Sequence, residues 1–224
     1  MNTAYVSASE VNSRMIGVYN HMFLAVVNSL VVSLIVASSP ALMSFFFGGI
    51  MKWVTVFAPL VVILAMGFVM NRASRSEAML MLQGFAALMG LSMSAIFVTF
   101  TTASIVSAFL GAAVLFGTMS FWGYFTKKSL ESWGSFLFVG LIAVVITSIV
   151  NVFLGNSTLA MVVSAVAIIV FLGLTAYDTQ RIRQEVSVAD PDRKAEIVGA
   201  LSLYLNFINL FMALLQLFGG RKED

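Results

Sequence analysis

The fold of this chain is decided by one uncharged stretch, residues 132–177, which reads SWGSFLFVGLIAVVITSIVNVFLGNSTLAMVVSAVAIIVFLGLTAY. Its 46 residues include no Asp, Glu, Lys or Arg. A helix that crosses a bilayer needs about 20 apolar residues, so this stretch is long enough for two crossings. Turn-forming and hydroxyl residues gather at residues 155–158 and indicate where the chain turns back.

The same pattern fills most of the remaining chain, in four further uncharged runs at residues 15–51, 53–71, 78–126 and 197–220. The longest of these divides at the hydroxyl-rich residues 101–104, whereas residues 41–50 are too short to cross a bilayer. The runs therefore predict an all-α membrane protein with seven transmembrane helices, at about 16–37, 53–71, 78–100, 103–125, 133–154, 158–178 and 197–218.

Composition excludes the other main classes of fold. Of the 224 residues, 60% are hydrophobic and 10% are charged, and the mean hydropathy is +1.01. Soluble domains carry about 25% charged residues, and membrane β-barrels are built from strands of about ten residues that alternate in polarity. We expect one membrane domain, residues 15–219, between an N-terminal tail, residues 1–14, and a C-terminal tail, residues 220–224. The first tail lacks the basic start of a cleaved signal.

The placement of the basic residues predicts the orientation in the membrane. Nine of the 12 lysine and arginine residues fall in the N-terminal tail or in the loops after the second, fourth and sixth spans. Basic loops stay in the cytoplasm, so we expect a cytoplasmic N-terminus and a C-terminus outside. The last span carries three amide side chains, and a re-entrant segment there is the alternative to a full crossing.

A polar stripe marks this last span. Ser202, Asn206, Asn209, Ala213 and Gln216 recur at steps of 4, 3, 4 and 3 residues, which places them on one face of a helix. A helix with such a stripe is expected inside a bundle. Ser202, Asn209 and Gln216 are candidate pore-lining residues, and close packing of helices through small and polar side chains is the equal alternative.

The chain lacks the residues that intramembrane catalysis needs. His21 is the only histidine, and Asp178 is the one carboxylate within a predicted span, whereas an aspartyl protease shares a proton between two. No lysine lies within a predicted span to form a Schiff base, and no phosphate-binding or dinucleotide motif occurs. We therefore expect no catalytic residue, cofactor, resident metal or nucleic-acid partner. His21 is expected to form a hydrogen bond between helices.

By position alone, Asp178 either begins the hydrated loop after the sixth span or has a functional role there. The sequence around it carries a resemblance. Residues 173–180, GLTAYDTQ, and 203–211, LYLNFINLF, resemble the paired signature of the Bax inhibitor-1 family of seven-span proteins, and residues 90–97, GLSMSAIF, resemble a third block. The likeness covers roughly residues 15–219. It implies a bacterial member in the inner membrane, with the last of its seven helices at the centre of the fold.

The resemblance also implies a pH-sensitive calcium leak. In the family, an aspartate in the sixth-span block and another in the seventh-span block share a proton and close the cytoplasmic end of the pore. An arginine that ends the second span competes for one of these carboxylates. Asp178 matches the first aspartate, and Arg72, which lies 18 residues before Gly90, matches the arginine. The second aspartate is replaced here by Asn206.

This replacement changes the expected chemistry. Two carboxylates in contact repel each other when both are ionised, so closure through such a pair needs a proton. An asparagine amide donates to an ionised carboxylate without one. We therefore predict that Asp178 and Asn206 still bridge the last two spans, while the pH gate is weakened, shifted or lost. Arg72 is expected to reach Asp178, and Arg75 is not.

Two functions follow from these residues and from what the resemblance implies. The first is a passive cation channel that carries Ca²⁺ as its transported ion, with an acidic group at the cytoplasmic mouth. The alternative is a non-conducting adaptor, gripped by its N-terminal tail, that modulates a membrane-bound quality-control protease or a stress response. An enzyme is not expected. The partners are the lipid bilayer and calcium ions, with the protease under the alternative, and the oligomeric state is open, a monomer included.

Overall fold

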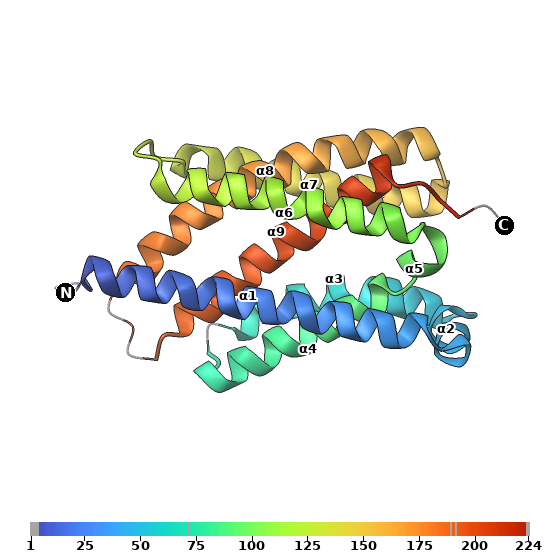
Figure 1. Ribbon diagram of the computed structural model, residues 1–224, viewed down its shortest axis with the longest axis horizontal. Helices are drawn as coiled ribbons and strands as arrows, with labels where there is room; N and C mark the ends of the chain where they lie inside the picture. Colours follow the sequence, from blue (N-terminus) through green and yellow to red (C-terminus); the bar gives the residue numbers. More distant parts are fainter. Residues whose placement is uncertain (1–4, 71, 189, 191, 223–224) are drawn as a thin grey trace. The chain divides into compact units, whose positions relative to one another are not determined.

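The computed structural model describes residues 5–70, 72–188, 190 and 192–222. In these ranges the chain forms nine helices (Figure 1): α1 Ala8–Ala37, α2 Pro40–Phe47, α3 Met51–Val69, α4 Arg75–Met93, α5 Ile96–Thr99, α6 Thr102–Phe125, α7 Glu131–Leu154, α8 Ser157–Ser187 and α9 Lys194–Phe218. An isolated antiparallel bridge joins Tyr5 and Val188. The predicted all-α class is confirmed.

The number of spans is also confirmed. Among the described residues, seven helical segments are long and apolar enough to cross a membrane, and α4 and α5 together make one of them, Arg75–Thr99. The short α2 occupies the segment that was expected to be too short to cross. Its start is set locally, because the Ser39 side chain accepts from the backbone N–H of Leu42 and Pro40 occupies the first turn.

Local sequence sets most of the other helix ends. Ser74 begins α4 in a capping box with Glu77, in which each side chain accepts from the other residue's backbone N–H. Thr101 caps α6 at the first predicted break, and its side chain accepts from the backbone N–H of Ser104. Gly155 ends α7 at the second predicted break with a φ of 62°, a left-handed conformation that glycine adopts without strain. The two breaks in the long uncharged runs are therefore where the sequence predicted them.

Two helices extend furthest beyond the apolar runs that predicted them. α1 begins at Ala8, and α8 continues to Ser187, beyond the expected limit of the sixth span at residue 178. The reason is that polar residues continue a helix as readily as apolar ones, while hydropathy measures only the part suited to hydrocarbon. Asp178 thus lies inside a helix and does not begin a loop.

The chain divides into two compact units. Unit 1 comprises Met1–Phe100, Val186–Tyr204 and Lys222–Asp224, and unit 2 comprises Thr101–Glu185 and Leu205–Arg221. Two helices contribute to both units. α8 passes from unit 2 to unit 1 after Glu185, and α9 passes from unit 1 to unit 2 after Tyr204.

In unit 1, α1 packs against α4. At their crossing a Cβ atom on Gly90 would lie 2.4 Å from the carbonyl oxygen of Ser29, so the crossing requires glycine. The Ser29 hydroxyl donates to the carbonyl of Ala86 over 2.7 Å and lies 2.6 Å from the hydroxyl of Tyr204 on α9. Small residues let the two backbones approach closely enough for these hydrogen bonds to form.

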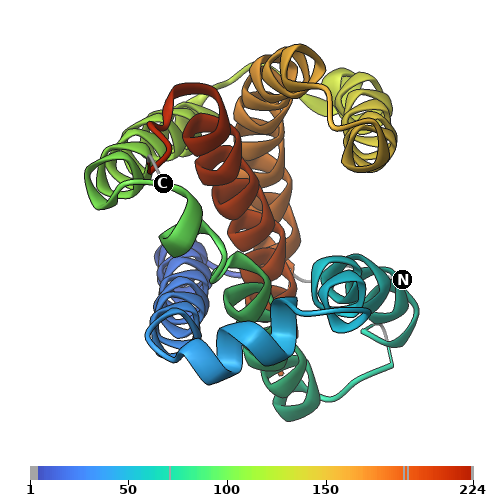
Figure 2. The same ribbon diagram turned by 90° about the vertical axis from the view of Figure 1, so that its right-hand side faces the viewer.

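In unit 2, α8 packs on both α6 and α7. A Cβ on Gly123 of α6 would lie 2.4 Å from the carbonyl oxygen of Ala176, which makes this a second glycine crossing. α7 and α8 run side by side (Figures 1 and 2), where a Cβ on Gly140 would meet Val170 at 3.1 Å. These contacts hold α8 against two neighbours near residues 173–180.

The last helix is the most buried of the seven spans. In its most apolar window 67% of the residues are buried, against 11% for α7. In unit 2 the ring of Phe207 meets those of Phe109 and Phe116 edge to face, with ring centroids 5.4 and 5.7 Å apart. The central position that the family resemblance implies for this helix stays a prediction.

Candidate functional site

Asp178 lies on α8 in unit 2, and only 7% of it is exposed. The helix is held firmly at this level. Besides the glycine crossing at Ala176, the hydroxyl of Thr179 lies 3.0 Å from that of Ser120 on α6, and it donates to the carbonyl of Thr175. The Asp178 carboxylate therefore belongs to a turn of α8 whose backbone is fixed by its packing against α6.

Both carboxylate oxygens of Asp178 have a partner. The amide nitrogen Nδ2 of Asn206 donates to Oδ2 over 2.7 Å, and Nη2 of Arg181 lies 3.0 Å from Oδ1. Arg181 is three residues further along α8, so the ion pair forms on one helix face. The structure therefore brings together Asp178 and Asn206, as the sequence predicted, and it adds Arg181.

This arrangement suits an ionised carboxylate. A guanidinium supplies the opposite charge, and an amide N–H supplies a hydrogen bond that an ionised oxygen accepts. The Asp178–Asn206 contact therefore needs no proton. Arg181 is 39% exposed in its side chain and lies 3.5 Å from Glu185, while its guanidinium faces the ring of Tyr177. The Arg181 guanidinium therefore contacts both the buried Asp178 carboxylate and the exposed Glu185 near the end of α8.

The sequence identified Arg72 as the arginine partner of Asp178. Arg72 is an exposed residue of the turn between α3 and α4 in unit 1, and its pairing with Asp178 stays a prediction. Arg75 is engaged within unit 1, where its Nη1 donates to the carbonyl of Asp192 over 3.1 Å. Sequence reasoning missed Arg181 because it assigned that residue to a loop, although the spacing of three residues from Asp178 was available as a signal.

The three candidate pore-lining residues differ in their surroundings. Ser202 is half-buried, and Gln216 is exposed. Asn209 is half-buried, and its amide donates to the carbonyl of Leu205 on its own helix over 2.8 Å. Their role in lining a pore stays a prediction.

A second buried carboxylate, Glu196, was not identified from the sequence. It lies at the start of α9 in unit 1 and is 2% exposed. Its Oε1 lies 2.6 Å from Nε of Arg193, and its Oε2 lies 3.9 Å from Nη2 of Arg75. The same Oε2 would be 2.5 Å from a Cβ on Gly17, so a glycine in α1 makes room for this carboxylate.

His21 lies one turn after Gly17 on α1. Its Nδ1 is buried, and among the described residues it has no hydrogen-bond partner, so the expected interhelical hydrogen bond is not made by this atom. Within the described ranges, no three side chains of the His, Cys, Asp or Glu types come together as metal ligands would.

Comparison with known proteins identifies the family. The sequence model described as "Inhibitor of apoptosis-promoting Bax1" matches residues 11–223. Inner membrane protein YbhL of Escherichia coli is 37% identical over 211 residues, which cover 92% of this chain and 90% of that protein. An uncharacterized protein of Caulobacter vibrioides is 38% identical over 222 residues, 93% of this chain and 89% of that protein. On these matches, the chain belongs to the Bax inhibitor-1 family of membrane proteins.

Proposed function

We propose that this protein is a passive leak for Ca²⁺ in the bacterial inner membrane, closed at its cytoplasmic end through Asp178 and Asn206. In this proposal the N-terminus is cytoplasmic and the C-terminus lies outside. The inner-membrane location is supported by the name of YbhL and by the seven apolar helices. No catalytic reaction is assigned to the chain.

The observation that carries the proposal is the state of the Asp178 carboxylate. It is buried, and its two oxygens are taken by Asn206 and Arg181. A carboxylate at the mouth of a path attracts cations, but it does so only when its oxygens are free to face them. The structure therefore corresponds to the closed state in our proposal, and opening separates Asp178 from Asn206.

The same geometry predicts a weak response to pH. Asn206 donates to ionised Asp178, so closure requires no proton uptake. Asn206→Asp would place two carboxylates in contact, and these repel when both are ionised. The variant would then close only while the pair holds a proton, and its leak would rise as pH rises through the titration of the pair.

Calcium flux through the purified protein in proteoliposomes tests this proposal. We expect the natural sequence to change its flux by less than about twofold between about pH 5 and about pH 8, and Asn206→Asp to change it by about tenfold. Asp178→Asn serves as the control that removes the proposed gate charge. A steep titration of the natural sequence that Asn206→Asp leaves unchanged would contradict the proposal.

The second arginine of the gate is tested by two matched variants. We expect Arg72→Ala to change the flux more than Arg75→Ala, because the family resemblance assigns Arg72 to the Asp178 carboxylate. Arg75 already contacts Glu196 and the carbonyl of Asp192. Equal effects of the two substitutions would argue against the pairing of Arg72 with Asp178.

The adaptor function remains the second candidate, and in it the N-terminal segment is the part that a partner protein binds. The described part of the N-terminal segment is seated on the chain, where the backbone N–H of Val6 donates to the carbonyl of Ser187 over 2.9 Å. A protein that gripped this segment would therefore also touch the end of α8. Loss of the cellular phenotype on deletion of residues 1–14, with calcium flux intact, would favour the adaptor.

A further inference from the structure

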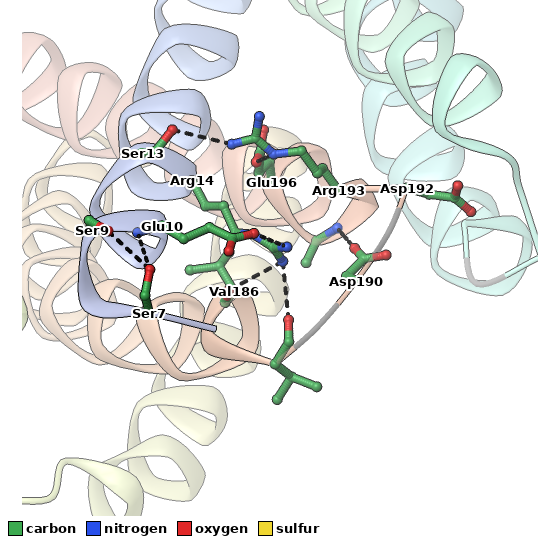
Figure 3. A network of polar contacts seen from close by, with 12 residues as sticks. Ser7, Ser9, Glu10, Ser13, Arg14, Val186, Asp190, Asp192, Arg193 and Glu196 are labelled. Atoms are coloured by element: carbon green, nitrogen blue, oxygen red, sulfur yellow. Dashed lines mark hydrogen bonds and ion pairs between the residues drawn. The ribbon is translucent and has the colours of Figure 1, made fainter. Parts of the chain in front are cut away.

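The N-terminal segment, residues 5–14, lies against residues 186–188 at the end of α8 and against Arg193 just before α9 (Figure 3). We name this contact the N-terminal clasp. All of it belongs to unit 1. At its tip Tyr5 forms the antiparallel bridge with Val188, next to the hydrogen bond from Val6 to Ser187.

Arg14 is the centre of the clasp. It is a charged residue with only 5% exposure, and its Nη1 donates to the carbonyls of Val186 and Val188 over 3.4 and 3.1 Å. Its other nitrogens Nε and Nη2 donate to Oε1 of Glu10 over 3.1 and 2.7 Å. In Figure 3 the Arg14 guanidinium lies next to the Glu10 carboxylate, and dashed lines join it to Glu10 and to the carbonyl of Val186. Arg14 is thus bonded on one side to its own helix and on the other to the end of α8.

This contact has a clear physical effect on α8. The last carbonyls of a helix lack partners within the helix and carry the negative end of its dipole. A buried guanidinium satisfies two carbonyls at this end and supplies the complementary charge, which makes it stronger than a neutral cap. α1 therefore holds the end of α8 through the buried guanidinium of Arg14, which separates from these carbonyls only if it leaves its buried position.

The clasp also reaches the start of α9. Nη2 of Arg193 lies 3.5 Å from the hydroxyl of Ser13, and Nε of the same residue lies 2.6 Å from Glu196. Glu196 in turn is seated against Gly17 of α1. One face of α1 therefore contacts both the last residues of α8 and the first turn of α9.

These two helices carry the proposed gate. Val186 follows Asp178 by eight residues on α8, which is about 12 Å along a helix. Asn206 follows Glu196 by ten residues on α9, about 15 Å along that helix. A restraint on the ends of α8 and α9 is transmitted along their continuous backbones, because a helix is stiff over this length.

We propose that the N-terminal clasp restrains the gate: it holds the ends of α8 and α9 in the arrangement in which Asp178 contacts Asn206, and its release increases the leak. Arg14 is a positioning residue that acts through the backbone of α8 and does not touch the ion. This inference rests on the proposed function, and it deepens it by assigning the regulation of the gate to the N-terminal segment.

The chain has no cysteine, which allows a clean test by a reversible crosslink. Tyr5 and Val188 are partners in an antiparallel bridge, and such partners have Cα atoms about 4.5–5.5 Å apart, within the range that a disulfide spans. We expect Tyr5→Cys with Val188→Cys to form a disulfide on oxidation and to lose about two thirds or more of the calcium flux. Reduction of the same protein should restore the flux, and each single cysteine variant should respond to neither treatment.

The opposite change is release of the clasp by Arg14→Gln. We expect the leak to rise about fivefold and the backbone amides at the end of α8 to exchange hydrogen faster. Arg14→Lys keeps the charge but not the fork of donors, so it should give a smaller rise. Lys127→Gln removes one positive charge at an exposed position of unit 2 and should leave the leak unchanged.

The outcomes separate the inference from the proposed function. The clasp restraint is overturned if the disulfide fails to form, or if it forms while Asp178→Asn alters the flux and oxidation does not. It is also overturned if Arg14→Gln speeds hydrogen exchange at the end of α8 without raising the leak. Absence of calcium flux from every variant and from the natural sequence would refute the proposed function itself.

Discussion

In each unit a short polar contact joins α9 to a neighbouring helix, and the two contacts differ in charge. In unit 1 the hydroxyls of Ser29 and Tyr204 lie 2.6 Å apart. In unit 2 the amide of Asn206 donates to the carboxylate of Asp178 over 2.7 Å. The hydroxyl pair needs no counter-ion, whereas the carboxylate is accompanied by Arg181. The first contact joins two helices through neutral groups, whereas the second joins two helices and also compensates a buried charge.

The surroundings of the two contacts are alike. Each lies near a crossing at which a glycine meets a backbone carbonyl, Gly90 against Ser29 in unit 1 and Gly123 against Ala176 in unit 2. Close backbones leave little space for water and fix the directions of the polar groups. The two units therefore share a way of packing and differ in the chemistry that this packing presents.

The largest effect is expected from filling the two crossings. Gly90→Ala and Gly123→Ala should each lower the free energy of unfolding by about 3 kcal/mol, because the new Cβ meets a backbone oxygen that cannot move aside. Unfolding by heat in detergent measures this loss. Gly84→Ala on α4 and Gly117→Ala on α6 are matched controls with no atom within 4 Å of the new Cβ, and they should be neutral or stabilising. Equal losses of stability at all four positions would refute the inference that the two crossings require Gly90 and Gly123.

The next largest effect is expected at the Asp178–Asn206 contact in unit 2, which includes a charged group. Asn206→Leu removes the donor from Oδ2 of Asp178 and leaves a buried carboxylate oxygen without its partner, so it should cost about 2 kcal/mol in the free energy of unfolding. The calcium leak should rise in the same variant, since the closing contact is gone. A stable variant with an unchanged leak would show that the contact neither holds nor closes the gate.

Removal of the Arg181 guanidinium is expected to cause a smaller loss in the free energy of unfolding. Arg181→Gln should cost about 1 kcal/mol, because the guanidinium is 39% exposed and the ion pair is partly screened by solvent. The matched control is Arg183→Gln, two residues away, whose Nη1 donates to the carbonyl of Tyr124. We expect only the first substitution to change calcium flux. An equal change in flux with both variants would mean that general surface charge is responsible.

The smallest effect belongs to the neutral contact in unit 1. Tyr204→Phe removes one hydroxyl, but the Ser29 hydroxyl keeps its hydrogen bond to Ala86, so about 0.5–1 kcal/mol should be lost. The calcium leak should stay the same. A rise in leak as large as that of Asn206→Leu would remove the distinction between a joining contact and a gating contact.

Much of the fold was predictable because a helix that crosses a bilayer needs about 20 apolar residues. The length of each uncharged run in the sequence can be compared with that number. The long uncharged run at residues 132–177 predicted two spans, and the structure divides it at Gly155. The break at Thr101 was equally visible, since a helix cap is a local feature. The Asp178–Asn206 contact was predicted through the family resemblance, which carries tertiary information that composition lacks.

The remaining partners were not predictable in this way. Arg14 was assigned to a tail and Arg181 to a loop, because a charged residue at the end of an apolar run normally faces water. Glu196 was not considered, although it is 2% exposed. Such burial depends on residues far apart in sequence, for example Gly17, which makes room for Glu196, and Val186, whose carbonyl Arg14 caps.

The class of protein, the seven spans and their breaks thus follow from the order of residues along the chain, because they depend on the length of apolar runs and on local caps. Which charges are buried, and what compensates them, depends on contacts between elements that are distant in the chain. A charge leaves water only where another element supplies its partner. For Asp178 that element is α9 with Asn206, and for Arg14 it is the end of α8.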